Sequence, residues 1–210
     1  MSLKIEVIAN GPFVENAYVL WDDDTKDAVI VDPGDEPDRI AGAVRVLALK
    51  VTEIVCTHAH IDHAGAVAEI KRRVAAPFAL HRDDLPVLQH LAPQARMFGL
   101  GSAETPAVER WLQEGDTVAV GSHEGRVIHT PGHTPGGCCL FFEQDRVLLA
   151  GDTLFQGSIG RTDLPGGSFD QIIASIKDKL LPLGDDVVVH CGHGPRTTIG
   201  AERRYNPFVQ

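Results

Sequence analysis

Three histidines and one aspartate stand within six residues of this sequence, and no other feature limits its fold as strongly. They are His58, His60, Asp62 and His63, in a polar turn between an apolar β-like run and an amphipathic helical pattern. Open α/β sheets bind ligands at the carboxyl ends of their strands, where this turn lies. An extended start of the turn places His58 and His60 on one side, and Asp62 and His63 diverge from them. Such a strip can serve two neighbouring metal ions, because one tetrahedral ion does not need so many adjacent ligands.

Three more metal-ligating side chains occur in the same local setting. His133, Asp152 and His193 each follow an apolar strand pattern and a glycine in a turn-like sequence. The other five histidines lack this setting, and we expect them at the surface or in supporting positions around a site. These are His81, His90, His123, His129 and His190.

Alternation and helical spacing predict that strands precede helices in each half of the chain. The expected strands cover residues 4–9, 17–21, 28–31, 52–56, 117–120, 126–129, 138–143, 146–150 and 187–190. The expected helices cover residues 40–48, 67–74 and 168–180, with a short helix after Thr198. Residues 82–107, which contain several prolines and glycines, are expected to form a broken helix and a mobile connection. This order predicts two β layers packed back to back with helices outside.

Length and charge narrow the class of protein. With 210 residues the chain can bury one sizeable core, so we expect a single domain over residues 1–210. The formal net charge of −10 disfavours nucleic acid as a partner, because a phosphate backbone would be repelled. No apolar run approaches the ~20 residues that cross a bilayer, and the first residues lack a signal-peptide pattern. We therefore expect a cytoplasmic protein without a membrane partner.

The four cysteines lie in or beside apolar stretches, and none forms a Cys-x-x-Cys pair. They are Cys56, Cys138, Cys139 and Cys191. Free cysteine is commonly buried, so we expect four buried and unpaired thiols.

The metal-ligating residues match, in order and type, the signature of the metallo-β-lactamase fold superfamily. The match consists of His58-x-His60-x-Asp62-His63, then His133, Asp152 and His193, and it runs almost from end to end. This resemblance implies an α/β fold, the αβ/βα sandwich in which two mixed sheets pack face to face with helices outside.

The resemblance also implies which residues share a metal ion. It assigns the first metal to His58, His60 and His133, the second to Asp62, His63 and His193, and the bridge between them to Asp152. Asp32, in a Val-Asp-Pro-Gly sequence, resembles the family's recurrent Asp-Pro-Gly, whose aspartate supports the site without binding metal.

Departures from the pattern separate the branches of this superfamily. The flavodiiron branch has Glu at the position of His60, and lactamases lack the bridging carboxylate of Asp152, so neither branch resembles this chain. Processing nucleases act on polyanions, which the net charge disfavours. Residues 151–167 instead resemble the corresponding segment of glyoxalase II enzymes and of persulfide dioxygenases, and residues 192–200 resemble the short bacterial glyoxalase II-like group. We therefore expect no helical C-terminal domain of the kind with which longer glyoxalase II enzymes hold glutathione.

The resemblance implies a binuclear, metal-dependent hydrolase of thioesters, of the hydroxyacylglutathione hydrolase type. Two divalent ions, Zn, Fe or Mn, would hold a bridging hydroxide near neutral pH, because coordination lowers the pKa of water to about 7. This hydroxide would attack the carbonyl of a small-molecule thioester, S-lactoylglutathione or a related acyl-thiol. Asp62 and Asp152 are the expected catalytic residues, because either carboxylate can orient the hydroxide.

Arg161 is the expected substrate-binding residue. In the longer glyoxalase II enzymes a Lys and a Tyr after the bridging Asp contact glutathione, and the matching positions are Arg161 and Asp163. Arg161 can meet a carboxylate of the substrate, whereas Asp163 cannot replace an aromatic hydroxyl. An equally weighted interpretation is a structural Arg161–Asp163 ion pair that fixes the loop.

Two other functions remain open at the level of sequence. A persulfide dioxygenase would bind one iron on His58, His133 and Asp152, the two-histidine, one-carboxylate set used in oxygen chemistry. A metal-binding protein without turnover is disfavoured, because purely structural sites prefer closed, cysteine-rich shells. The sequence does not distinguish a monomer from a dimer.

Overall fold

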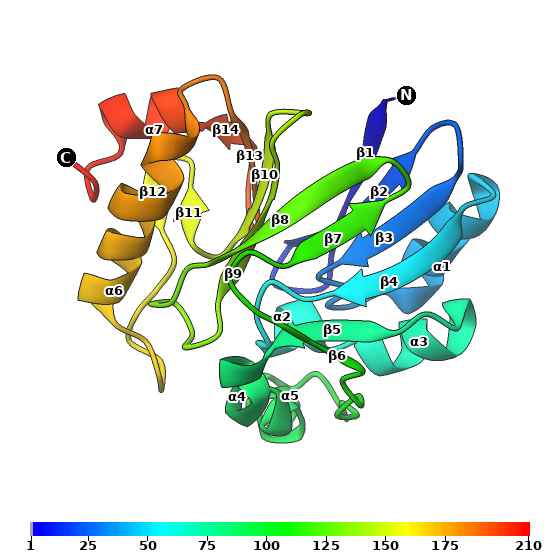
Figure 1. Ribbon diagram of the computed structural model, residues 1–210. Coiled ribbons are helices and arrows are strands. Elements are labelled where there is room, and N and C mark those ends of the chain that lie inside the picture. The colour runs from blue at the N-terminus through cyan, green and yellow to red at the C-terminus, as the bar shows by residue number, and fades with distance from the viewer. Residues whose placement is uncertain (1) are drawn as a thin grey trace.

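The computed structural model describes residues 2–210 and contains two sheets of six strands (Figure 1). In the first sheet the strands follow one another in sequence order. They are β1 (Leu3–Asn10), β2 (Glu15–Asp22), β3 (Asp27–Val31), β4 (Lys50–Val55), β5 (Phe78–His81) and β6 (Arg110–Leu112). The pairs from β1 to β3 are antiparallel and those from β3 to β6 are parallel. The first three strands therefore form an antiparallel meander, and the last three extend the sheet in parallel.

The second sheet has the order β14-β13-β10-β9-β8-β7. Its strands are β7 (Thr117–Val120), β8 (His123–His129), β9 (Cys138–Phe142), β10 (Val147–Gly151), β13 (Val188–Cys191) and β14 (Thr197–Thr198). Only β10 and β13 pair in parallel among these described strands. A small two-stranded sheet, β11 (Leu154–Phe155) and β12 (Ser158–Ile159), follows β10 in the chain.

The two sheets pack face to face, and helices cover their outer faces (Figure 1). Helices α1 (Pro37–Val46) and α3 (Val67–Val74) lie on the first sheet, and α6 (Phe169–Ala174) and α7 (Ile199–Tyr205) lie on the second. Strand β2 is buried at seven of its eight positions, as expected for a strand covered on both faces. The sandwich architecture expected from the sequence is confirmed.

Some element boundaries differ from the prediction. Residues 82–107 contain a 3₁₀ turn (Arg82–Asp84) and two short helices, α4 (Leu85–Gln89) and α5 (Leu91–Phe98), which confirms the broken helix. Strand β8 begins at His123, three residues before the expected start. The β9–β10 turn spans residues 143–146, because Arg146 adopts a left-handed φ of 56° and donates its N–H to the Glu143 carbonyl.

The helix predicted over residues 168–180 is also less regular than expected. Ser168 caps its start by accepting a hydrogen bond from the N–H of Gln171. The α-helix ends at Ala174 and continues as a π-helical turn (Ser175–Leu180) and a 3₁₀ turn (Leu181–Leu183). The hydroxyl of Ser175 donates to the Pro131 carbonyl at the change, which attaches this helix to the loop after β8.

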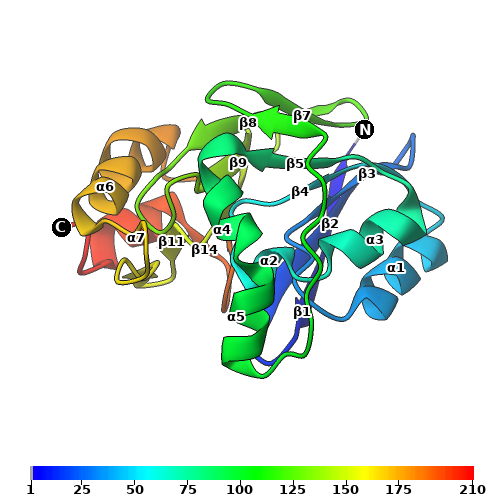
Figure 2. The same ribbon diagram turned by 90° about the horizontal axis from the view of Figure 1, so that it is seen from below.

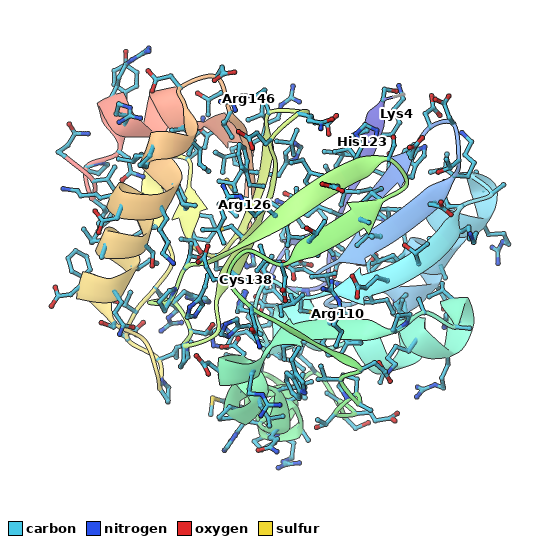
Figure 3. All side chains as sticks on the ribbon, viewed as in Figure 1. Lys4, Arg110, His123, Arg126, Cys138 and Arg146 are labelled. Atoms are coloured by element: carbon cyan, nitrogen blue, oxygen red, sulfur yellow. The ribbon has the colours of Figure 1, made fainter. Side chains whose placement is uncertain are left out.

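All four cysteines are buried and unpaired, as predicted. Figure 3 shows Cys138 near the centre of the molecule, where it belongs to the core between the sheets. Within residues 2–210, no helix has the length and apolar character that crossing a membrane requires.

Candidate metal centre

The seven predicted metal-ligating residues lie together at one end of the sandwich. The turns after β4, β8, β10 and β13 carry five of them, and α2 (Ile61–Ala64) carries Asp62 and His63 (Figures 1 and 2). Glycine is needed where these segments meet. A Cβ at Gly192 would lie 2.2 Å from Oδ1 of Asp152, and a Cβ at Gly34 would lie 1.4 Å from the carbonyl oxygen of Asp62. Gly192 thus allows the backbone to approach the Asp152 carboxylate, and Gly34 allows two main-chain segments to meet at Asp62.

Three histidines form the first group of candidate ligands. Nε2 of His133 lies 2.9 Å from Nδ1 of His60 and 3.2 Å from Nε2 of His58. Nitrogens bound to one tetrahedral zinc ion at 2.0–2.1 Å lie about 3.3 Å apart, so these atoms need only a small adjustment. The rings of His58 and His60 contact each other edge to face, which confirms that both point to the same side.

Asp62, His63 and His193 form the second group. Nε2 of His193 lies 3.2 Å from Oδ2 of Asp62, and Nε2 of His63 lies 3.9 Å from the same oxygen. Asp152 stands between the two groups. Its Oδ2 is 3.5 Å from Nε2 of His133, and its Oδ1 is 3.4 Å from Nε2 of His63. Oδ2 also lies 3.7 Å from Nε2 of His193, so the carboxylate is within reach of both groups, as a ligand shared by two metal ions would be.

Two buried atoms of this cluster lack a hydrogen-bond partner. Nε2 of His63 and Oδ1 of Asp152 are both inaccessible to solvent and face each other at 3.4 Å without forming a hydrogen bond. An unpaired buried polar atom costs about 1–3 kcal/mol, so such a pair indicates a missing ligand. Neutral imidazole and carboxylate oxygen are donors that suit Zn, Fe and Mn. The residues present therefore fit a site for divalent metal ions.

Comparison with known proteins agrees with this site. The profile of the metallo-beta-lactamase superfamily matches residues 10–193. This chain belongs to the metallo-β-lactamase superfamily. The hydroxyacylglutathione hydrolase GloC of Haemophilus influenzae is 39% identical over 209 residues, which cover 99% of this chain and 98% of that protein.

Two solved structures are similar over nearly the whole chain. The crystal structure of the BLEG-1 B3 metallo-beta-lactamase is 39% identical, with a TM-score of 0.92 over 99% of this chain and 100% of that chain. The crystal structure of TTHA1623 in a di-iron-bound form is also 39% identical, with a TM-score of 0.88 over 97% and 99% of the two chains.

Hydrogen bonds to backbone carbonyls orient two of the imidazoles, those of His133 and His193. Nδ1 of His133 lies 2.8 Å from the Arg161 carbonyl, and Nδ1 of His193 lies 3.2 Å from the Phe13 carbonyl. A carbonyl only accepts, so each Nδ1 carries the proton and each Nε2 is free to bind a metal. The orientation of both rings is therefore fixed before a metal binds.

Asp32 is the centre of a second set of supporting contacts, as the sequence predicts. Its Oδ2 accepts a hydrogen bond of 2.7 Å from the Thr57 hydroxyl and lies 3.1 Å from Nδ1 of His63. The Thr57 hydroxyl oxygen in turn lies 3.2 Å from Nδ1 of His58. Glu15, which the sequence reasoning missed, places its unpaired Oε1 3.7 Å from Nδ1 of His63. Burial raises the pKa of the Glu15 carboxyl well above its usual range.

Asp84 is a further buried acid that the sequence reasoning missed. Its carboxylate accepts hydrogen bonds from the Ala59 N–H at 2.8 Å, the Gly136 N–H at 2.6 Å and the Thr134 hydroxyl at 3.0 Å. Ala59 lies between two candidate ligands, and the other two donors follow His133. Asp84 therefore holds the turn after β4 against the turn after β8. Burial raises its pKa despite these hydrogen bonds.

The cluster holds its carboxylates ionised and His58 and His60 neutral, but burial of His63 and His193 is outweighed by Asp62 and Asp152, which raise the pKa of both imidazoles. Burial, with neighbouring imidazoles, lowers the pKa of His58 well below its usual value and lowers that of His60 to about 3. Burial alone would raise the pKa of Asp62 and Asp152, but His63 and other nearby imidazoles outweigh it and hold both values low. Neutral imidazole and ionised carboxylate bind metal, so His58, His60 and both carboxylates are ready to bind, whereas a metal ion would have to displace a proton from His63 and His193.

A cavity of about 420 Å³ opens onto the cluster. Aromatic and aliphatic side chains form much of its wall, namely Phe13, Ile61, Phe98, Phe155, Ile159 and Leu164. Arg161 also lines this cavity, and its guanidinium makes two hydrogen bonds of 2.8 Å to the Asp163 carboxylate. Both charged groups are exposed. This ion pair is the one that the structural interpretation of Arg161 requires. The backbone carbonyl of Arg161 also orients His133. Binding of substrate by Arg161 stays a prediction.

Proposed function

We propose that this protein hydrolyses thioesters, with S-lactoylglutathione or a related acyl-thiol as substrate. The observation that carries the proposal is the position of Asp152, whose two oxygens face the two groups of candidate ligands. The 39% identity to a hydroxyacylglutathione hydrolase supports this choice of substrate class. In this proposal His58, His60 and His133 would hold one divalent ion, Asp62, His63 and His193 would hold another, and Asp152 would be a ligand shared between the two groups.

When bound, two divalent ions supply a water-derived nucleophile at neutral pH and polarise the thioester carbonyl. The protein's own contribution is to position and orient. Asp62 and Asp152 are ionised, so each carboxylate can accept a hydrogen bond from the attacking water. That hydrogen bond directs the water's lone pair toward the carbonyl carbon in the cavity.

Covalent catalysis by a side chain is not needed in this proposal. A thiolate is a good leaving group, so the carbonyl–sulfur bond breaks without a dedicated general acid. None of the described residues that line the 420 Å³ cavity is a cysteine. Burial also raises the pKa of Cys138 and Cys191, which keeps both thiols protonated and unreactive.

Substrate binding in this proposal uses the apolar wall of the cavity. Phe13 and Phe98 meet edge to face with ring centroids 5.1 Å apart, so two segments distant in sequence close over the same side of the cavity. Their burial against the stem of a bound thioester excludes water and gives affinity. The exposed guanidinium of Arg161 is the candidate partner for a carboxylate of the substrate.

The first experiment is steady-state hydrolysis of S-lactoylglutathione by the purified protein, with bound Zn, Fe and Mn counted on the same sample. Asp152→Ala is measured in parallel. The proposal requires rapid turnover with about two metal ions per chain and loss of turnover in a folded Asp152→Ala protein. Near-normal hydrolysis by Asp152→Ala would disprove it. Because a B3 metallo-beta-lactamase is among the similar structures, nitrocefin hydrolysis is measured as a competing activity.

A second candidate function is persulfide oxidation at a single iron. The observation in its favour is that His133 Nε2 lies 3.2 Å from His58 Nε2 and 3.5 Å from Asp152 Oδ2, which brings two histidines and one carboxylate together. The same samples separate the two functions. One iron per chain, oxygen uptake with glutathione persulfide and no thioester hydrolysis would select the oxygenase.

A further inference from the structure

A groove of about 520 Å³ lies between β1, the edge strand of the first sheet, and β10 and β13 of the second sheet (Figure 1). Figure 3 shows Lys4, one of its lining residues, near the start of β1. None of the described residues that line the groove is a candidate metal ligand or lines the 420 Å³ cavity over those ligands. The volume lies within the range of about 300–1,000 Å³ that small-molecule sites occupy. The groove is therefore a candidate binding site separate from the metal centre.

The floor of the groove is apolar. Leu3 and Ile5 of β1 and Val147 of β10 line it and also pack against the core between the sheets. Val7, which alternation places on the same face of β1 as Ile5, extends this surface and is 46% exposed. Val188 of β13 completes it from the second sheet. Covering exposed apolar surface gains free energy, so the floor favours a ligand with a hydrocarbon part.

His190 places a polar side chain without a partner in the wall of the groove. The residue is 8% exposed, and its ring packs edge to face on Tyr18 with the centroids 5.5 Å apart. Neither ring nitrogen makes a hydrogen bond to a residue within 2–210, and neither is sealed from solvent. The Tyr18 hydroxyl is already used, because it donates to the Cys191 carbonyl at 2.6 Å. A polar side chain this deeply buried is normally hydrogen-bonded, so the free imidazole of His190 indicates a ligand in the groove.

Two exposed cationic side chains also line the groove. Arg196, directly before β14, makes no hydrogen bond or ion pair with any residue that the structure describes. Burial, together with the charge of Arg196, lowers the pKa of His190 to about 4, so the guanidinium lies near the imidazole. Nζ of Lys4 lies 3.9 Å from a carboxylate oxygen of Asp23, which Lys26 approaches more closely, at 2.9 Å. The charges of Arg196 and Lys4 are therefore available to an anion.

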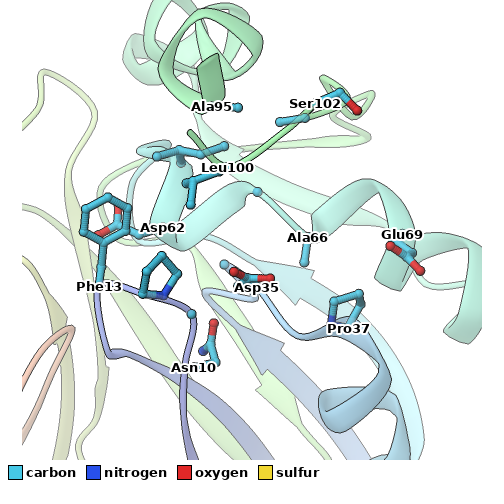
Figure 4. A pocket seen from close by; sticks show the side chains of 16 residues that line it. Asn10, Phe13, Asp35, Pro37, Asp62, Ala66, Glu69, Ala95, Leu100 and Ser102 are labelled. Carbon is cyan, nitrogen blue, oxygen red and sulfur yellow. The ribbon is translucent and has the colours of Figure 1, made fainter. Parts of the chain in front are cut away.

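The positive lining distinguishes the groove from the other cavities. Figure 4 shows a cavity of about 160 Å³ between the β1–β2 turn, the start of α1 and the segment around α5, and none of its described lining residues is Lys, Arg or His. Its charged lining residues are Asp35, Asp62 and Glu69. In the cavity over the candidate ligands, the guanidinium of Arg161 is paired with Asp163. The described lining of the groove contains no Asp or Glu. In a chain with a net charge of −10, the groove is therefore a local site for an anion.

We propose that this groove, the anion groove lined by Lys4, His190 and Arg196, binds the carboxylate of a small organic acid with an unbranched hydrocarbon tail. A guanidinium pairs with a carboxylate through two parallel hydrogen bonds, and the neutral imidazole of His190 has one N–H to add a third. The tail covers Ile5 and Val7 and so removes apolar surface from water. This inference goes beyond the proposed thioester hydrolysis and does not depend on it, because the groove and the metal-site cavity share no described lining residue.

Isothermal titration of the purified protein, with its bound metal, tests the head group and the tail separately. We expect saturable binding of octanoate, and binding about tenfold weaker or less for 1-octanol, which lacks the charge, and for butyrate, which lacks most of the tail. Equal affinity for octanoate and 1-octanol would overturn the proposal, because the cationic side chains would then have no role. Affinity for inorganic phosphate equal to that for octanoate would overturn it as well, because the apolar floor would then have none.

Variants locate the ligand. Arg196→Gln removes one exposed charge and should weaken octanoate binding about tenfold. Arg45→Gln, which changes an exposed arginine in the last turn of α1, is the matched control and should bind like the wild type. Arg161→Gln removes the cation of the cavity over the candidate metal ligands and should also have no effect. Loss of binding in Arg161→Gln but not in Arg196→Gln would place octanoate at the metal site and contradict the proposal.

Two further variants address the wall and the floor. His190→Phe keeps a ring against Tyr18 but removes both nitrogens, and it should weaken octanoate binding about tenfold. Val7→Gln makes the exposed part of the floor polar and should weaken it about threefold. Circular dichroism checks that each variant is folded. If His190→Phe does not fold, Val7→Gln and Arg196→Gln decide alone, and wild-type affinity in both would refute the proposal.

An anionic lipid surface offers the same kind of head group and tail. Co-sedimentation with phosphatidylglycerol vesicles is therefore measured beside the titration. Binding to vesicles without binding of dissolved octanoate would assign the groove to a membrane surface and overturn the proposal. Octanoate binding that depends on Arg196 supports it, with or without co-sedimentation.

Discussion

Oδ2 of Asp32 lies 3.1 Å from Nδ1 of His63, so the other ring nitrogen of His63 faces the metal centre. Asp32 adopts a φ of 52°, a left-handed conformation that Asn tolerates well and Ala does not. Asp32→Asn therefore keeps the backbone but exchanges an acceptor for a donor opposite Nδ1. We expect metal affinity to fall about 10- to 100-fold, as for other partners that orient metal-binding histidines.

Competition with a chromogenic chelator measures that affinity. Asp27→Asn, which changes a half-buried acid paired with Lys50 at the start of β3, is the control and should retain wild-type affinity. Unchanged metal binding in Asp32→Asn would show that the orientation of His63 does not depend on this carboxylate.

The contacts of Asp84 predict a large effect on stability. Asp84→Ala leaves the N–H groups of Ala59 and Gly136 buried without an acceptor. Each such group costs about 1–3 kcal/mol, so the free energy of unfolding should fall by about 3 kcal/mol or more. Urea denaturation of the metal-free protein checks this value. Asp83→Ala changes the exposed neighbouring acid and should stay within about 0.5 kcal/mol of wild type.

The fold and the ligand cluster were accessible from sequence for a specific reason. Five of the seven candidate ligands lie in the turns that follow apolar strands, so local patterns and strand ends already place His58 and Asp152 at the same edge. Asp84 has no such signal, because its partners are set by tertiary packing and not by neighbours in the chain. The three-residue strand β6 was missed because alternation cannot be recognised over Arg110–Leu112. The β9–β10 turn depended on a left-handed Arg146, a conformation that its residue type does not announce.

His190 predicts how stability depends on pH. Burial, with a smaller effect from Arg196, lowers its pKa from 6.5 to about 4 in the folded protein. Above pH 6.5 the imidazole is neutral in both states and has no effect. As pH falls from 6.5 to 4, the unfolded chain takes up a proton that the folded chain does not, so stability falls by about 3 kcal/mol.

Urea titrations at pH 7 and pH 4 isolate this contribution when wild type is compared with His190→Asn. The difference between the two proteins should shift by about 3 kcal/mol in favour of the variant at the lower pH. His90→Asn, an exposed histidine of the same type, is the control. A constant difference between wild type and His190→Asn at both pH values would show that His190 titrates normally in the folded protein.

Gly42 offers a substitution that should stabilise the fold without touching the site. It lies in the middle of α1, and a Cβ built there meets no atom within 4 Å. Glycine inside a helix costs about 0.5–1 kcal/mol relative to alanine, because the unfolded chain loses more freedom. Gly42→Ala should therefore raise the free energy of unfolding by that amount and leave metal content and hydrolysis unchanged.

Gly192→Ala is the contrasting substitution, because its Cβ would lie 2.2 Å from Asp152 Oδ1. It should lower both the free energy of unfolding and the metal content. Thermal unfolding and metal counting on both variants check the pair, and a destabilised Gly42→Ala would mean that α1 is constrained by something other than helix propensity.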